Sequence, residues 1–393
     1  MKILYVLNST TLVGGGNKSF LRLLERVRKE HEVKVICPNE REITPYLRSK
    51  GIDVEVVCYE FATYLAADSL RNKLLWIPRM LRRLWRNRCA VPKIEAIARA
   101  FGPDIIQSNC SVIDVGSRVA RRLGVPHVLH VREYGNCELG WHHYGLQKRL
   151  TSPGSYSICI TRDIARVLGV EGRSTNRCIY NPIVDESEIC EISPKEDYFL
   201  YAGRIDPDKG IADLIDGYIL YCREAKGKIL PLKMAGAFQS QRQQSLKQEM
   251  ERRLKKEGLA DYVEWLGEIK DIYSLMRAAK ACIIPSYMEG FGRVMPEAQS
   301  QGCLTIVRNA GGLKEQLDNG MSQTGHDIAL MFDDVEGLAK SLHQVREMSD
   351  NDVNVIIGLS QKTVRNLYTN AASASQVLEF YDYIAGEYPS KNK

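Results

Sequence analysis

Two short segments in the second half of the chain carry side chains that could bind an anion and a polyol. In the first, residues 201–210, Gly203 lets a ligand approach the backbone closely. Arg204 and Lys209 place a forked donor and a point charge where both can reach one anion, and a diphosphate suits this pair. A solvated loop with an exposed arginine and lysine explains this segment equally well when it is considered alone.

The second segment, residues 289–297, begins and ends on a glutamate. The carboxylates of Glu289 and Glu297 can accept hydrogen bonds from the hydroxyls of a polyol, and the glycines between them expose backbone amides. The alternative is a surface glutamate followed by one that stabilises the first turn of a helix. Because both segments follow predicted strands of the same half of the chain, we favour the binding interpretation.

A third candidate is a glycine-rich loop between the first predicted strand and the first predicted helix. Its glycines are Gly14, Gly15 and Gly16, and Asn17-Lys18-Ser19 follows. A P-loop needs glycine directly before Lys-Ser, and a dinucleotide fingerprint needs glycine at position 19, so both standard motifs fail. The loop amides and the helix dipole could still accept a phosphate or a sugar. A tight turn without a ligand is the alternative.

Short apolar runs alternate with amphipathic stretches along both halves of the chain, which is typical of parallel α/β domains. We predict strands at residues 3–7, 33–37, 54–57, 105–108, 128–131, 157–160, 199–202, 232–235, 263–266, 281–284, 304–307 and 328–331. Helices are predicted at, among others, 17–29, 113–123, 211–225, 241–256 and 376–387. The expected fold class is α/β, with two facing Rossmann-like domains and a cleft at the carboxyl ends of both sets of strands.

Acidic and polar residues around Pro182 and Pro194 mark the seam between the domains. We therefore predict an N-terminal domain at 1–185 and a second domain at 197–373. A C-terminal helix and tail at 374–393 can pack back on the N-terminal domain.

The composition excludes several classes of protein. The chain has 393 residues, 44% hydrophobic and 26% charged, which suits two ordinary globular domains. Its eleven cysteines form no CxxC motif, so we expect no metal site and no disulfide framework, and a reduced, cytoplasmic compartment. No apolar stretch approaches the roughly eighteen residues of a membrane span, so any membrane association should be peripheral.

The net charge of +6 is unevenly distributed, because residues 1–190 carry +10 and residues 191–393 carry −4. Seven cations and no acid lie between Arg71 and Arg88. They alternate with apolar side chains near helical spacing, as in an interfacial helix attracted to anionic lipid, and Pro78 should start or kink this helix. The predicted membrane-contact residues are Trp76, Arg79, Arg82, Arg83, Trp85 and Arg86.

A helix packed on its own domain, with a solvated basic face, is the alternative explanation of this stripe. Nucleic acid is not an expected partner, because no recognised binding module accompanies the charge.

Together, these segments resemble the retaining glycosyltransferases of family 4, two-domain enzymes with the GT-B fold that use nucleotide sugars. The resemblance spans most of the chain and includes residues 181–185, which stand where such enzymes often have an Asn-Gly-Val-Asp segment. It implies an N-terminal acceptor domain, a C-terminal donor domain, and retention of anomeric configuration with no metal and no cofactor besides the donor.

The resemblance also assigns roles to residues. Arg204 and Lys209 would bind the donor diphosphate, Glu297 the ribose hydroxyls and Glu289 the transferred sugar, with Arg204, Lys209 and Glu289 counted as catalytic. The full expected donor-binding set is Gly14, Gly15, Gly16, Gly203, Arg204, Lys209, Glu289, Gly290, Phe291, Gly292, Arg293, Val294 and Glu297.

The sequence departs from the family pattern at the strand before the acceptor cleft. Many members end this strand in Val-x-x-x-His-Asp, whereas this chain has Arg132 and Glu133 at the last two places and His130 two residues earlier. We assign Arg132 and Glu133 to catalysis in the cleft. His130 is either an acceptor-cleft residue or a buried histidine of the core.

The predicted function is transfer of a hexose from a nucleotide sugar to a hydroxyl of a lipid-linked saccharide in surface polysaccharide assembly. The expected partners are the nucleotide sugar, that acceptor and the anionic inner face of the cytoplasmic membrane. Two alternatives remain open. One is a nucleotide-sugar epimerase or soluble-acceptor transferase of the same fold, and the other is a non-catalytic nucleotide- or sugar-binding protein.

Overall fold

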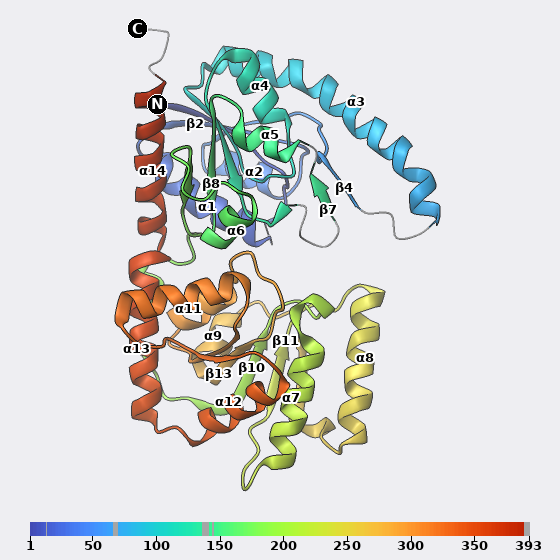
Figure 1. Ribbon diagram of the computed structural model, residues 1–393, viewed down its shortest axis with the longest axis vertical. Coiled ribbons are helices and arrows are strands. Elements are labelled where there is room, and N and C mark those ends of the chain that lie inside the picture. The colour runs from blue at the N-terminus through green and yellow to red at the C-terminus, as the bar shows by residue number, and fades with distance from the viewer. Residues whose placement is uncertain (13, 66–69, 136–140, 144, 389–393) are drawn as a thin grey trace. The chain divides into compact units, whose positions relative to one another are not determined.

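The computed structural model describes residues 1–12, 14–65, 70–135, 141–143 and 145–388, and it divides the chain into two compact units (Figure 1). Unit 1 consists of Met1–Pro182 and Asn370–Lys393, and unit 2 of Ile183–Thr369. Each unit is built around a parallel sheet, as the alternation of apolar and amphipathic stretches predicted.

Unit 1 contains a seven-stranded parallel sheet in the order β3-β2-β1-β5-β6-β8-β9. Its strands are β1 (Lys2–Val6), β2 (Glu32–Cys37), β3 (Asp53–Val56), β5 (Ile105–Ser108), β6 (His127–Val131), β8 (Ser155–Cys159) and β9 (Asn176–Cys178). The helices before the C-terminal segment are α1 (Gly15–Val27), α2 (Ile43–Ser49), α3 (Leu70–Phe101), α4 (Val115–Leu123), α5 (Leu146–Thr151) and α6 (Arg162–Val167). A small antiparallel pair, β4 (Thr63–Leu65) and β7 (Trp141–His143), was not predicted.

Both faces of this sheet are covered, which is why its central strands read as continuous apolar runs. Ile3 and Tyr5 of β1 pack in one cluster with α1, whereas Leu4 and Val6 pack in another with α3 and α4. The C-terminal helix α14 (Asn370–Glu387) joins the first cluster, and the hydroxyls of Tyr5 and Tyr381 lie 3.0 Å apart. The expected packing of the C-terminal helix on the N-terminal domain is therefore confirmed.

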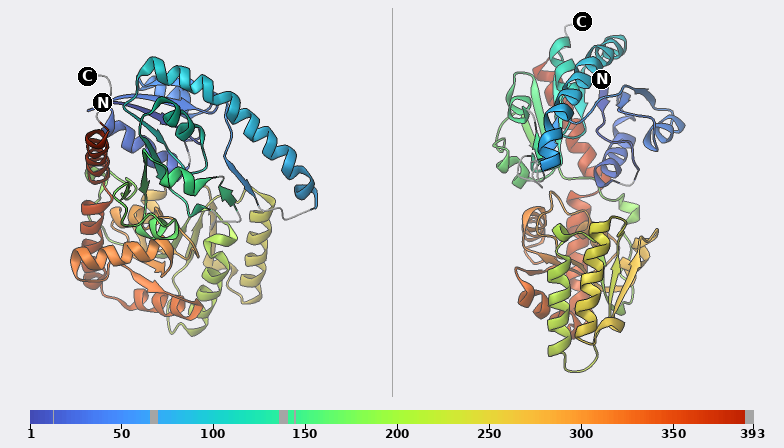
Figure 2. Two further views of the ribbon diagram at one scale, coloured as in Figure 1. Left: turned by 45° about the horizontal axis from the view of Figure 1, so that its top comes forward. Right: turned by 90° about the vertical axis from the view of Figure 1, so that its right-hand side faces the viewer.

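Unit 2 contains a six-stranded parallel sheet in the order β12-β11-β10-β13-β14-β15. Its strands are β10 (Glu196–Ala202), β11 (Leu232–Ala235), β12 (Val263–Gly267), β13 (Ala279–Ile284), β14 (Thr305–Arg308) and β15 (Leu330–Phe332). Its helices are α7 (Ile211–Glu224), α8 (Gln241–Lys256), α9 (Ile272–Ala278), α10 (Val294–Ser300), α11 (Gly311–Thr324), α12 (Val335–Glu347) and α13 (Asp350–Leu367). Helices α7 and α8 run side by side (Figure 2).

All twelve predicted strands are present, with ends shifted by a few residues at most. The strand order reverses direction between β1 and β5 in unit 1, and between β10 and β13 in unit 2. Ligands of doubly wound sheets bind at such switch points, outside the carboxyl ends of the strands. The glycine loop follows β1, and the segments 201–210 and 289–297 follow β10 and β13, so all three lie beside a switch point.

Helix α3 is much longer than the predicted stripe around residues 74–86. It has 32 residues, and both Pro78 and Pro92 lie inside it, so Pro78 does not start the helix. In Figures 1 and 2 its N-terminal part projects away from the seven-stranded sheet of unit 1. Among the described helices, none is both long enough and apolar enough to cross a membrane.

Candidate active site

The structure brings the two anion- and polyol-binding segments of unit 2 together. Strands β10 and β13 are adjacent and parallel, with Leu200 opposite Cys282 and Tyr201 opposite Ile283, so the loops after them emerge side by side. Lys209 Nζ donates a hydrogen bond of 2.8 Å to Glu289 Oε1. The Lys209 and Glu289 side chains are only 18% and 21% exposed, so this ion pair is partly shielded from water. Two residues 80 positions apart thus form one charged centre.

Arg204 lies on the same loop and is paired with acids of that loop. Its guanidinium lies 3.1 Å from an Asp206 carboxylate oxygen and 3.9 Å from one of Asp208. The Arg204 side chain is 62% exposed, so these surface pairs are weak and the guanidinium is accessible to a ligand. An incoming diphosphate would compete with two carboxylates for this arginine.

Two glycines fix the path of the 203–210 loop. A Cβ atom on Gly236, directly after β11, would lie 1.7 Å from the carbonyl oxygen of Gly203. A Cβ atom on Gly210 would lie 2.0 Å from the carbonyl oxygen of Pro285, and Gly210 has a φ of +67°. Sequence reasoning did not select Gly236, because only the pairing of β10 with β11 places it against Gly203.

The 289–297 segment is held by α11. The Gly312 amide donates to the Glu289 carbonyl at 2.8 Å, and Gln316 Nε2 donates to the Phe291 carbonyl. Phe291 is buried, with its ring edge-on to Tyr368 at 5.4 Å between centroids. Sequence reasoning missed Gly312 and Gln316, which position the backbone between the two glutamates.

Glu297 lies in the first turn of α10 and is paired with Arg293. Arg293 Nη2 lies 2.9 Å from Glu297 Oε1, and the two side chains are 15% and 14% exposed. A ribose hydroxyl at Glu297 would therefore share the carboxylate with Arg293. Val294 packs against the hydrophobic core of unit 2.

In unit 1, the glycine loop lies against Arg132. Helix α1 begins at Gly15, and its N-cap residue, Gly14, makes no side-chain capping bond. A Cβ atom on Gly16 would lie 3.3 Å from Arg132 Cδ, so Gly16 permits this close approach. The first turn of α1 and the guanidinium of Arg132 thus belong to one site.

Arg132 is held by two asparagines. Its Nε donates to the Asn109 carbonyl at 3.2 Å and its Nη2 to Asn109 Oδ1 at 3.0 Å. Its Nη1 donates to Oδ1 of Asn181. Asn109 directly follows β5, and sequence reasoning did not select it because only the sheet order brings it beside β6.

Glu133 accepts hydrogen bonds from the loop after β5. The donors are the Ser111 amide at 2.8 Å, the Ser111 hydroxyl and the Cys110 thiol at 3.3 Å. The carboxylate therefore holds residues 110 and 111 in place beside Arg132. His130 is buried between Gln107 and Arg132, and burial followed by the Arg132 charge lowers its pKa well below the ordinary value for histidine.

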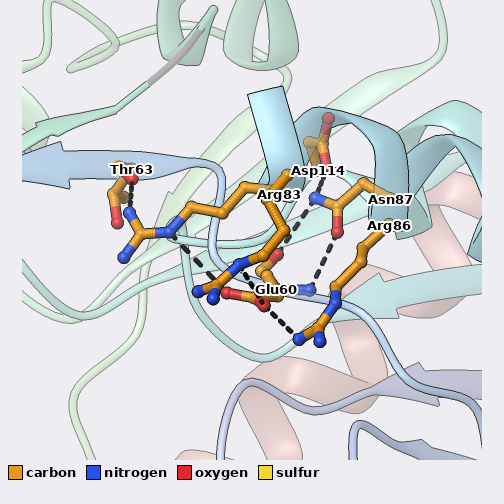
Figure 3. A network of polar contacts seen from close by, with 7 residues as sticks. Glu60, Thr63, Arg83, Arg86, Asn87 and Asp114 are labelled. Atoms are coloured by element: carbon orange, nitrogen blue, oxygen red, sulfur yellow. Dashed lines mark hydrogen bonds and ion pairs between the residues drawn. The ribbon is translucent and has the colours of Figure 1, made fainter. Parts of the chain in front are cut away.

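The predicted membrane-contact stripe lies on α3 and exposes large apolar side chains. Leu74 is 78% exposed and Trp85 is 65% exposed, and Ile77, Leu81 and Leu84 are exposed as well. The cations beside them are partly engaged, because Arg82, Arg83 and Arg86 converge on the carboxylate of Glu60. Figure 3 shows Arg83 and Arg86 around this carboxylate. Glu60 and these three arginines form the Glu60 cluster, which carries three positive charges and one negative charge and is therefore basic.

Two family models match the chain. The model for glycosyl transferases group 1 matches residues 185–354, and that for the glycosyl transferase 4-like domain matches residues 14–167. The chain belongs to the GT-B glycosyltransferases of the family 4 type.

Curated relatives agree with this family. The chain is 29% identical over 175 residues to the lipopolysaccharide core biosynthesis mannosyltransferase LpsB of Rhizobium meliloti, covering 42% of this chain and 47% of LpsB. It is 33% identical over 147 residues to glycogen synthase of Mycobacterium tuberculosis, covering 37% of this chain and 33% of that enzyme. The chain thus spans less than half the length of these curated relatives.

Solved structures share the fold over nearly the whole chain. Anabaena HepE, in complex with UDP, has a TM-score of 0.73 and 19% identity, and the match covers 98% of this chain and 100% of HepE. A glycosyltransferase from Rickettsia africae has a TM-score of 0.74 and 16% identity, covering 100% and 99% of the two chains. The predicted GT-B fold is therefore confirmed.

Proposed function

We propose that this glycosyltransferase moves a hexose from a nucleotide diphosphate sugar to a saccharide hydroxyl, with retention of anomeric configuration and without a metal ion. The observation that carries this proposal is the Lys209–Glu289 ion pair at the switch point of the unit 2 sheet. It joins a cation suited to a diphosphate with a carboxylate suited to sugar hydroxyls. The UDP complex of the HepE neighbour supports a nucleotide donor.

The chemical step needs stabilised departure of negative charge. The bond between the sugar C1 and the diphosphate oxygen breaks, and a bond from C1 to the acceptor oxygen forms on the same face. The acceptor proton moves to the departing phosphate oxygen. Arg204 and Lys209 supply fixed positive charge at the leaving group, which is where such charge lowers the barrier most.

Glu289 has two tasks in this proposal. Before the donor binds, it holds Lys209 in a shielded position, so that the ammonium is already oriented for the diphosphate. When the donor is bound, the carboxylate accepts hydrogen bonds from hydroxyls of the transferred sugar. Gly312 and Gln316 keep the backbone around Glu289 and Phe291 fixed during both steps.

Unit 1 supplies the residues assigned to the acceptor. Arg132, held by Asn109 and Asn181, is a rigid donor beside the first turn of α1. We propose that the acceptor is a lipid-linked saccharide. Support comes from the mannosyltransferases of lipopolysaccharide core and O-antigen assembly among the relatives, and from the exposed apolar stripe on α3.

The α3 stripe would rest on an anionic membrane surface. Exposed Leu74, Ile77, Leu81, Leu84 and Trp85 can enter the boundary between headgroups and acyl chains, and the basic Glu60 cluster lies next to them. We propose that this surface is the cytoplasmic leaflet.

Product analysis tests this function. Purified protein is incubated with α-anomeric nucleotide sugars of uridine, guanosine and adenosine, and with a lipid-linked saccharide extract, in EDTA. We expect an α-linked product by proton NMR and unchanged turnover in EDTA. A β-linked product would contradict retention, and activity restored only by a divalent ion would contradict metal independence. An altered sugar without acceptor would instead identify an epimerase, and nucleotide binding without any product a binding protein.

A further inference from the structure

A chain of buried hydrogen bonds runs from the C-terminal helix to the Arg132 site. The Tyr381 hydroxyl donates to Gln107 Oε1 at 2.5 Å, and Gln107 Nε2 lies 3.4 Å from His130 Nδ1. Arg132 Nη2 lies 3.4 Å from the same His130 nitrogen. Tyr381, Gln107 and His130 are at most 3% exposed, so water does not compete for these contacts.

This chain fixes the tautomer of His130. An arginine can only donate hydrogen bonds, so Nδ1 of His130 must be an acceptor. The Gln107 amide then has to turn its nitrogen toward His130, and this is consistent with its oxygen accepting from Tyr381. Because Nδ1 carries no proton and burial keeps the ring neutral, the proton resides on Nε2. His130 therefore presents an N–H donor.

That donor has no hydrogen-bond partner among the described residues, and a second one nearby has none either. The two atoms are Nε2 of His130 and Nδ2 of Asn109, whose residues are 3% and 1% exposed. They belong to one cluster, because Arg132 Nη2 lies 3.0 Å from Asn109 Oδ1 and 3.4 Å from His130 Nδ1. Buried donors without partners are costly, so a ligand that satisfies both would gain from them.

We propose that the Nε2–H of His130 and the amide of Asn109 bind a saccharide hydroxyl oxygen beside Arg132. This inference rests on the proposed function and names the chemistry that the Arg132 site recognises. Because both donors are uncharged, we assign a neutral hydroxyl rather than a phosphate to them. His130 is thus a binding residue, and Gln107 and Tyr381 are positioning residues that keep its Nε2 protonated.

The first test measures the tautomer directly. Nitrogen-15 NMR of histidine-labelled protein, with His130 assigned by the His130→Gln variant, should show a pyrrole-like Nε2 and a pyridine-like Nδ1 at neutral pH. A pyrrole-like Nδ1 would overturn the proposal. This measurement needs neither donor nor turnover, so its failure is distinct from failure of the proposed function.

The second test measures binding with UDP, UDP-glucose and octyl α-mannoside as probes. His130→Leu removes the donor, whereas His130→Gln places an amide nitrogen near the position of Nε2. Loss of one neutral hydrogen bond weakens binding by about 3- to 10-fold, so His130→Leu should show this loss and His130→Gln should recover most of it. If the variant binds UDP-glucose more weakly but binds UDP as the wild type does, the hydroxyl belongs to the donor sugar. If it binds octyl α-mannoside more weakly in the presence of UDP, the hydroxyl belongs to the acceptor.

Asn109→Asp keeps the side-chain oxygen that accepts from Arg132 but replaces the amide nitrogen, Nδ2, by an oxygen that cannot donate. This variant should bind the same saccharide probe more weakly, as His130→Leu does. The matched control is Asn176→Asp, a buried asparagine of unit 1 that accepts a hydrogen bond from Ser157 elsewhere in the sheet, and it should bind all probes like the wild type. If His130→Leu and Asn109→Asp leave every saccharide affinity unchanged, the two donors serve an internal water and the proposal is wrong.

Discussion

Replacing Gly236 by alanine should displace the loop that we propose binds the donor diphosphate. The added Cβ atom would lie 1.7 Å from the Gly203 carbonyl oxygen, and real Cβ atoms essentially never approach closer than 3.0 Å. The backbone at Gly203 or Gly236 must therefore move by at least 3.0 − 1.7 = 1.3 Å. Arg204 is the next residue, so the displacement passes directly to the diphosphate-binding guanidinium.

A misplacement of about 1 Å in a catalytic group can cost about 100-fold in rate. We therefore expect Gly236→Ala to lower kcat/KM by about 100-fold or more, and overpacking to destabilise unit 2 by about 1–3 kcal/mol. Initial rates measure the first effect, and urea unfolding followed by circular dichroism measures the second. Both should be measured on the same preparation, so that the rate is compared for folded protein.

The matched control is Gly358→Ala. Gly358 lies inside α13, and a Cβ atom there would meet no atom within 4 Å. This variant should keep the wild-type rate and gain up to about 1 kcal/mol in stability, because alanine favours a helix over glycine. A folded Gly236→Ala protein with wild-type kcat/KM would refute the reasoning, since the loop would then tolerate the displacement or take no part in donor binding.

Three further predictions follow from the same contacts. Glu289→Gln should lower kcat/KM by about 10- to 100-fold, because the charged hydrogen bonds from Glu289 to the sugar are lost. Its affinity for the free nucleoside diphosphate should stay within a few fold of the wild-type value. Initial rates measure the first effect and calorimetry the second. Burial lowers the pKa of His127 to about 3, so the imidazole stays neutral in the folded protein at pH values where it is protonated in the unfolded chain. The free energy of unfolding should therefore fall as the pH drops below about 6.5, by about 2 kcal/mol between pH 7 and pH 5. The urea midpoint of His127→Gln should depend less on pH than that of the wild type. An equal pH dependence in the two proteins would contradict this prediction. Changing Leu74, Leu81 and Trp85 together to serine should reduce binding to phosphatidylglycerol vesicles by about 100-fold or more. Changing Met331 and Val355, two exposed apolar residues of unit 2, to serine should have no effect.

The strands were predictable because a buried parallel strand is apolar along its whole length. Val6, Ile106 and Ile283 sit in such runs, and each is fully buried. The extent of α3 was not predictable, since its two prolines and its many exposed apolar residues obscure the periodicity. Strands β4, β7 and β9 have three residues each and include polar side chains, so they leave no apolar run, whereas the equally short β15 consists of Leu-Met-Phe.

The candidate site was predictable where one segment carried several chemical groups. Lys209 and Glu289 could be selected by type, but their contact depends on β10 lying next to β13, and the strands between them in sequence, β11 and β12, lie elsewhere in the sheet. Asn109 and Gln316 have ordinary side chains in ordinary surroundings, and only tertiary contacts give them a role. Likewise, nothing in the basic stripe indicates that Glu60 gathers three of its arginines.

Isothermal titration with UDP, GDP and ADP, on the wild type and on Lys209→Met, tests the central claim most directly. We predict that the wild type binds at least one of the three, and that Lys209→Met weakens that binding by about 10- to 100-fold, as expected for loss of a charged hydrogen bond. Because the 203–210 loop is assigned to the diphosphate, AMP, GMP and UMP should bind weakly to both proteins. Equal affinity of the wild type and Lys209→Met for every nucleoside diphosphate, or no binding at all, would contradict the assignment of this site to the donor.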